Sequence, residues 1–150
     1  MKKTFRIVPL PTEVAEKARR ASTPDHQIVI ADAPEAFPCR HCLRWADPGE
    51  ALVLFPYHSI PQGRPYSESG LIFVHREPCE RYSKVNEYPG AFRQGRVVRG
   101  YDAHDEMIAA DGAGDIPEAV IETMLANPEV AYLQVRSVTR GCFTMKAERV

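Results

Sequence analysis

The chain has 150 residues, the usual size of one domain, and a fold of this length buries roughly two-thirds of its unfolded surface. We therefore expect a single globular domain over residues 1–150. An apolar fraction of 44% and a charged fraction of 26% exclude a disordered or coiled-coil chain. Nineteen basic and twenty acidic residues leave a net charge of −1, which argues against nucleic acid or an anionic membrane as partner. A small molecule or another protein is left as the partner class.

The sequence also predicts a cytoplasmic protein. The apolar stretch Phe5–Leu10 is interrupted by Arg6 and Pro9 and is too short for a signal peptide. No window reaches the roughly 18 apolar residues that a membrane-spanning helix needs. In a reducing cytosol, cysteines are thiols, metal ligands or transient redox partners rather than permanent disulfides. The cysteines are Cys39, Cys42, Cys79 and Cys142.

The first half of the chain predicts short strands around one helix. Phe5–Leu10 has the composition of a strand, and a helix follows over Glu13–Arg20 with Thr12 as its N-cap. Gln27–Ala31 and Ala51–Phe55 are apolar runs bounded by Pro, Asp and Gly. Such runs are typical of strands that are buried on at least one face.

The middle of the chain is rich in loops. Pro56–Gly70 contains three prolines and two glycines and predicts a long ordered loop or an irregular edge. Leu71–His75 predicts a strand. Arg76–Gly95 is polar and interrupted by prolines, so it allows at most a short helical turn. Because long loops often carry function, the middle is where we expect a functional face.

The last third predicts a β-β-α-β-β unit. Val97–Tyr101 and Met107–Ala110 flank a short acidic connection and form one hairpin. Asp115, as an N-cap, begins a helical pattern with a single apolar stripe. The alternating runs Val130–Val138 and Cys142–Ala147 form a second hairpin. The fold class is therefore α+β, with a largely antiparallel sheet of about eight short strands and two helices on one face.

Five short motifs spread over nearly the whole chain are distinctive in their order and spacing. They are Phe5-Arg6-Ile7, Pro38–Leu43, Gly70–His75, Tyr101-Asp102-Ala103 and Gly141-Cys142-Phe143. Together they resemble the bacterial family called domain of unknown function 1203. The resemblance implies a bacterial cytosolic protein built as one domain. It brings no activity, substrate or catalytic residue with it, so no catalytic residue is assigned.

The C-x-x-C motif of Cys39 and Cys42 is the strongest chemical signal. At this spacing one tight turn directs two thiolates to a single ion, as in half of a zinc site. His75 and Cys79 would complete a Cys₃His set, which tetrahedral zinc accepts. The gap of 32 residues between the two halves exceeds the usual spacing, and Cys142 or His41 could replace either ligand. A structural zinc ion that supports a binding face is the first hypothesis.

Thiol redox chemistry is the second hypothesis. Arg40 and His41 lie between the two sulfurs and Arg44 lies beyond them, and such cations favour a thiolate on Cys39 or Cys42. The thioredoxin arrangement is disfavoured because Pro48 and Gly49 leave room for only about one helical turn after the motif. A c-type haem is excluded, since a leucine follows the second cysteine.

Two further interpretations require no reactive cysteine. Free cysteines are often buried as small apolar packing groups. In addition, the tyrosines and arginines of the loop-rich middle suit a metal-free interaction module. No glycine-rich phosphate loop or helical HExxH motif is present in the sequence, and whether the chain is an enzyme stays open.

Overall fold

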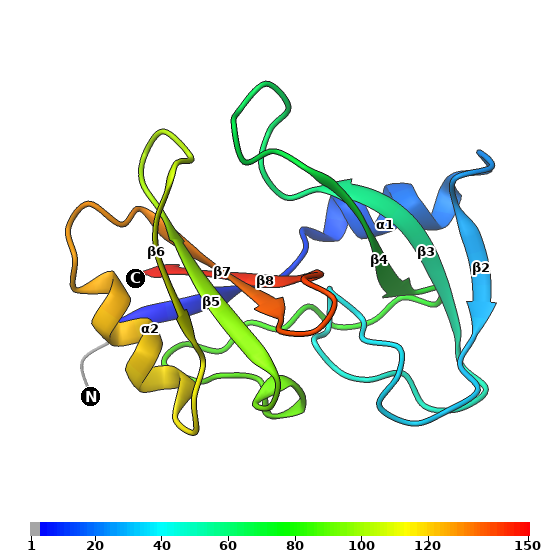
Figure 1. The fold of residues 1–150 in the computed structure, drawn as a ribbon. Coiled ribbons are helices and arrows are strands. Elements are labelled where there is room, and N and C mark those ends of the chain that lie inside the picture. The colour runs from blue at the N-terminus through cyan, green and yellow to red at the C-terminus, as the bar shows by residue number, and fades with distance from the viewer. Residues whose placement is uncertain (1–3) are drawn as a thin grey trace.

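A computed structural model describes residues 4–150, and within this range the chain forms eight strands, two α-helices and a short 3₁₀ helix, η1 (Gly90–Phe92) (Figure 1). The strands form two antiparallel sheets that lie side by side. The predicted α+β class with antiparallel strands is confirmed. The connection 76–95 separates the three strands of the smaller sheet from the last four strands of the larger one.

The larger sheet has five strands in the order β1-β8-β7-β5-β6. Both predicted hairpins, β5–β6 and β7–β8, are present, and α2 lies between them in the chain, which confirms the β-β-α-β-β unit. Ile121 and Leu125 of α2 pack with Leu133 and Val135 of β7 in one buried cluster. The bounds are β1 (Phe5–Val8), β5 (Arg96–Tyr101), β6 (Met107–Gly112), α2 (Pro117–Leu125), β7 (Tyr132–Ser137) and β8 (Phe143–Arg149).

The smaller sheet has the order β2-β3-β4, with β2 (Gln27–Ile30), β3 (Ala51–His58) and β4 (Ser69–His75). Helix α1 (Thr12–Arg20) packs its alanine face against β3 and β4 in a second buried cluster. The apolar face of this helix is small, but alanines let a helix approach a sheet closely. Each sheet therefore carries its own helix, and the expectation that both helices share one face is wrong.

Both predicted helix caps are wrong. Thr12 is the first residue of α1 instead of its N-cap, and its hydroxyl lies 2.8 Å from Nε2 of His41. Ile116 occupies the N-cap of α2, and no side chain caps that helix. Pro117 at the first helical position already has the φ angle of a helix, so α2 begins there without help from Asp115.

The predicted loop Pro56–Gly70 is shorter than expected, because β3 continues to His58 and β4 begins at Ser69. Pro56 is tolerated in β3 because β2 begins with Gln27 opposite Leu54, so the position of the missing N–H faces no strand. The remaining loop, 59–68, packs on the larger sheet. There the amide of Gln134 donates to the hydroxyl of Ser59 at 3.1 Å.

The prediction that Gln27–Ala31 is buried on at least one face is confirmed for the face of Val29 and Ala31, which pack with Leu52 in a third buried cluster, but the opposite face of β2 is exposed. Ile28 and Ile30 are 51% and 57% exposed. The reason is the position of β2 at the margin of the smaller sheet, beyond the strands that α1 covers (Figure 1). Within residues 4–150, neither α-helix is long and apolar enough to cross a membrane.

Candidate metal centre

The C-x-x-C motif forms a tight turn. The N–H of Leu43 donates to the carbonyl of Cys39 at 3.0 Å, and the N–H of Cys39 donates to the carbonyl of Arg44 at 2.9 Å. Leu43 has a φ angle of +58°, which is uncommon for a leucine, and its side chain is fully buried in the core of the larger sheet. Core packing therefore holds the backbone in a strained conformation directly after the second cysteine. No helix follows Cys42, as Pro48 and Gly49 predicted.

The turn lies along the outer edge of β4. The N–H of Arg40 donates to the carbonyl of Phe73 at 3.0 Å, and Cys39 forms a parallel bridge with the same residue. The N–H of His75 donates to the sulfur of Cys39 at 3.3 Å. Pairing with the edge of β4 thus brings the C-x-x-C turn next to His75, although 32 residues separate them in the sequence.

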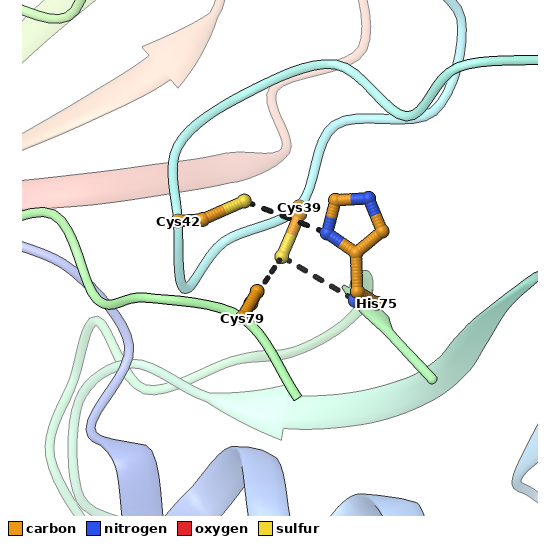
Figure 2. Close-up of side chains that lie close together, drawn as sticks. All are labelled: Cys39, Cys42, His75 and Cys79. Carbon is orange, nitrogen blue, oxygen red and sulfur yellow. Dashed lines mark hydrogen bonds between the residues drawn. The ribbon is translucent and has the colours of Figure 1, made fainter. Parts of the chain in front are cut away.

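The four predicted ligands meet at this edge (Figure 2). Cys39, Cys42, His75 and Cys79 each offer one ligand atom, and these atoms all lie within 4.8 Å of one another. The sulfurs of Cys39 and Cys79 are 3.9 Å apart, and the sulfur of Cys42 is 3.4 Å from Nδ1 of His75. Cys79 is half-buried and the other three are buried.

The separations of 3.9 Å between two sulfurs and 3.4 Å between a sulfur and a nitrogen match those of a tetrahedral zinc site. With Zn–S bonds of about 2.3 Å and Zn–N bonds of about 2.0 Å, two ligand sulfurs are about 3.8 Å apart and a sulfur and a nitrogen about 3.5 Å. The side chains of Cys39, Cys42 and His75 point toward one another in Figure 2. The buried Cys₃His cluster therefore has the composition and the spacing of a site that could hold a metal such as zinc.

Two groups orient the histidines around the cluster. Nε2 of His75, the ring nitrogen turned away from Cys42, lies 3.2 Å from Oε1 of Glu50. A carboxylate in this position fixes the ring of a metal-ligating histidine and raises its basicity. His41 is buried between Thr12 and Cys79, and its Nδ1 lies 3.1 Å from the Cys79 sulfur. His41 thus contacts Cys79 and is not one of the four clustered residues.

Cations surround the sulfurs. Nη2 of Arg19 donates to the sulfur of Cys79 at 3.5 Å, and its Nε donates to the carbonyl of His75 at 2.8 Å. A hydrogen bond with Cys42 raises the pKa of Arg44, so the positive charge of that side chain is held beside the cluster. A divalent ion held by three thiolates would carry a net negative charge, which these arginines would offset.

Without a metal, the groups of the cluster differ strongly in pKa. Hydrogen bonds with Cys42 and Cys79 hold the pKa of Cys39 far below that of a free thiol. Contacts with Cys39 and Cys42 raise the pKa of Cys79, and the same two sulfurs raise the pKa of His75 to about 10. The metal-free state at neutral pH is therefore a Cys39 thiolate beside a His75 imidazolium and a Cys79 thiol.

Arg40 joins the turn to the larger sheet. Its side chain is buried; Nε donates to the carbonyl of Phe143 in β8 at 2.7 Å, and Nη1 donates to the carbonyl of Pro38 at 2.9 Å. Burial lowers the pKa of Arg40 to about 10. One of the three residues that the redox hypothesis used to favour a thiolate is thus directed toward β8.

Other residues with ligand or acid–base side chains lie elsewhere. Cys142 is outside the group of four, and its sulfur contacts only the carbonyl of Arg140, at 3.9 Å, among the hydrogen bonds of residues 4–150. His58 lies beside Gln62. Asp102 accepts backbone N–H donors within its own turn, which is turn chemistry rather than a cation site.

Sequence reasoning missed Glu50, Arg19 and Thr12 as parts of the site. Glu50 precedes β3 and reaches His75 across the smaller sheet, while Arg19 and Thr12 come from α1. A lone acidic residue before a strand and an arginine in the last turn of a helix are common features without special meaning. The sequence holds no signal that would have singled them out.

The family model for proteins of unknown function DUF1203 matches residues 36–149. The chain belongs to this family. The match contains all four residues of the cluster, whereas Arg19 and Thr12 precede it. Neither a curated protein nor a solved structure matches the chain significantly.

Proposed function

We propose that Cys39, Cys42, His75 and Cys79 of this DUF1203 protein bind one Zn²⁺ ion and that the ion is structural. The observation that carries the proposal is the approach of all four ligand atoms to within 4.8 Å of one another in a largely buried cluster. Four protein ligands complete the tetrahedral coordination of a zinc ion and leave no position for water or substrate. The ion therefore stabilises the fold and does not act as a catalyst.

The proposed ion secures the loop-rich middle of the chain. Residues 31–50 and 76–89 contain neither helix nor strand, apart from isolated bridges, and each supplies at least one ligand. Irregular connections of this length in a compact fold need a stabilising element or a function. A zinc ion would fix both connections against β4, and rigid loops of this kind provide the binding face that the sequence suggested.

A metal site accounts for the burial of the cysteines better than redox chemistry does. Cys39 is fully buried and Cys42 is 4% exposed. A thiol that reacts with an external oxidant or substrate needs at least partial access to it. A redox pair would nevertheless also contain a thiolate on Cys39 with the Cys79 sulfur 3.9 Å away. The test must therefore distinguish a zinc site from a redox pair.

The test is the zinc content of untagged protein, measured by elemental mass spectrometry, together with thiol titration before and after chelation. We expect about one zinc per chain and slow thiol modification until a chelator removes the ion. Cys79→Ser should lose the zinc, and Cys142→Ser, outside the cluster, should keep it. Metal-free protein with fast-reacting thiols would replace this proposal with redox chemistry, and metal-free protein with inert thiols would reduce the cluster to packing.

A further inference from the structure

Strand β2 gives the smaller sheet an unprotected edge. Within residues 4–150 it pairs only with β3, and its sequence Gln27–Ile30 contains no charge, proline or glycine. Ile28 and Ile30 are among the most exposed large apolar residues of the structure. Proteins usually protect sheet edges with charges, prolines, bulges or covering loops, because an open edge can pair with another strand.

The other three sheet edges carry such protection. Val85 forms a bridge along the free side of β1, and Cys39 does so along β4. On β6 the carboxylate of Asp111 accepts the backbone N–H of Gly112 at 2.8 Å, which uses a donor of that edge. Figure 1 shows β2 at the margin of the molecule with no segment beyond it. Among the edge strands of the described chain, β2 alone has no charged residue, proline or glycine and no segment bridged along it.

The outward backbone groups of β2 belong to the two exposed isoleucines. The N–H of Ala31 donates to the carbonyl of Glu50 at 2.9 Å, so Ala31 faces β3. The N–H and C=O groups of successive residues in a strand point to alternate sides, so the backbone groups of Val29 also point toward β3. Ile28 and Ile30 therefore direct their N–H and C=O groups away from β3. Their side chains lie on the face of the smaller sheet that α1 covers at β3 and β4.

We propose that β2 pairs antiparallel with β2 of a second copy of this chain, with the two-fold axis at Val29. In this register Ile28 lies opposite Ile30 of the partner subunit, and both residues direct backbone groups toward each other. Val29 lies opposite the partner subunit's Val29, and both face their own β3. A register shifted by one residue would place an outward residue opposite an inward one and lose the hydrogen bonds. The two smaller sheets thus join into one continuous sheet.

The side chains around β2 fit a second copy rather than an unrelated partner. The sequence Ile-Val-Ile is symmetric about Val29, so each isoleucine meets a β-branched residue across the strands. The same register aligns His26 with Asp32 of the partner subunit and aligns no two acidic residues. Self-complementarity of this kind is what a two-fold interface requires.

The first test is the mass of the full-length wild-type protein in solution, measured by light scattering and by sedimentation over a range of concentrations. We expect a dimer whose dissociation constant rises by about 30-fold or more in Ile28→Lys, the loss that a central interface residue causes. Ile108→Lys is the matched control, because Ile108 is 40% exposed on the edge strand β6. A monomeric wild type, or equal effects of both variants, would overturn the proposal.

The second test checks the register by oxidative cross-linking in a Cys142→Ser background. Val29→Cys places two cysteines opposite each other at about 4.5 Å between Cα atoms, within the range of a disulfide. Ile30→Cys places its two copies more than about 7 Å apart, too far for a disulfide. Selective cross-linking of Val29→Cys would support the register, and equal or absent cross-linking of both would refute it. The β2 edge and the β4 edge, where the metal centre lies, are on opposite sides of the smaller sheet. A dimer that persists after zinc chelation would therefore show that dimerisation does not depend on the metal centre.

Discussion

Oε1 of Glu50 lies 3.2 Å from Nε2 of His75, while the other nitrogen of the same ring lies 3.4 Å from the sulfur of Cys42. The imidazole thus bridges a carboxylate and the cysteine cluster. Glu50 also accepts the N–H of Asp47 at 2.7 Å, and this bond, followed by the contact with His75, lowers the pKa of Glu50. The carboxylate is therefore ionised beside the ring at neutral pH and fixes its orientation.

Glu50→Gln should weaken zinc binding about tenfold without changing the stoichiometry. Removal of a carboxylate that supports a metal-ligating histidine lowers metal affinity by about 10–100-fold, and the amide oxygen of glutamine retains part of the contact. Competition with a chromophoric chelator measures the affinity. Glu77→Gln is the matched control, because Glu77 is exposed between His75 and Cys79 and carries the same charge. Equal affinities in the two variants would mean that Glu50 does not act through His75.

Replacement of a ligand should destabilise the protein as much as removal of the metal does. A ligand that binds only the native state stabilises it by about 4 kcal/mol when its free concentration is about 1,000 times its dissociation constant. We expect Cys39→Ser to lower the free energy of unfolding by about this amount in the presence of zinc, measured by urea denaturation. Cys142→Ser should leave it within about 1 kcal/mol of the wild type. If a chelator does not lower the wild-type stability to that of the variant, the cysteine contributes through packing instead.

Zinc binding at pH 7 should release at least two protons. His75, with its pKa raised to about 10, and Cys79, with its pKa also raised, are both protonated in the metal-free cluster and must lose these protons to bind the ion. Zinc affinity should therefore fall as the pH decreases from 8 to 6. Calorimetry in buffers of different ionisation enthalpy gives the number of protons released. Binding without proton release would contradict this assignment of protons.

Arg40→Met should destabilise the protein without removing the zinc. The substitution leaves the buried carbonyl of Phe143 and the part-buried carbonyl of Pro38 without their charged donor, at a cost of about 2–4 kcal/mol. Thermal or urea denaturation measures the loss, and elemental analysis should still give about one zinc per chain. Arg20→Met, at an exposed position in α1, provides the control. Unchanged stability would show that the burial of the Arg40 charge costs as much as its hydrogen bonds contribute.

The hairpins and the ligand types could be predicted from the sequence because they depend on residues close together in the chain. Alternating apolar residues define β7 and β8, and the turn between Cys39 and Cys42 needs only local geometry. The same local reasoning was wrong for Thr12 and Asp115. Both residues have the chemistry of a helix cap, but Thr12 bonds to a distant histidine and a proline begins α2 in place of Asp115.

Only the tertiary structure decided how these local pieces meet. Apolar periodicity indicates that one side of a strand tends to be buried but does not say which element covers it, and for this reason the exposure of Ile28 and Ile30 was not predicted. The pairing of the Cys39 segment with β4, which brings His75 to the turn, depends on backbone hydrogen bonds that any sequence can form. The sequence by itself thus determined which side chains could bind a metal. The register of one sheet edge decided that they lie together.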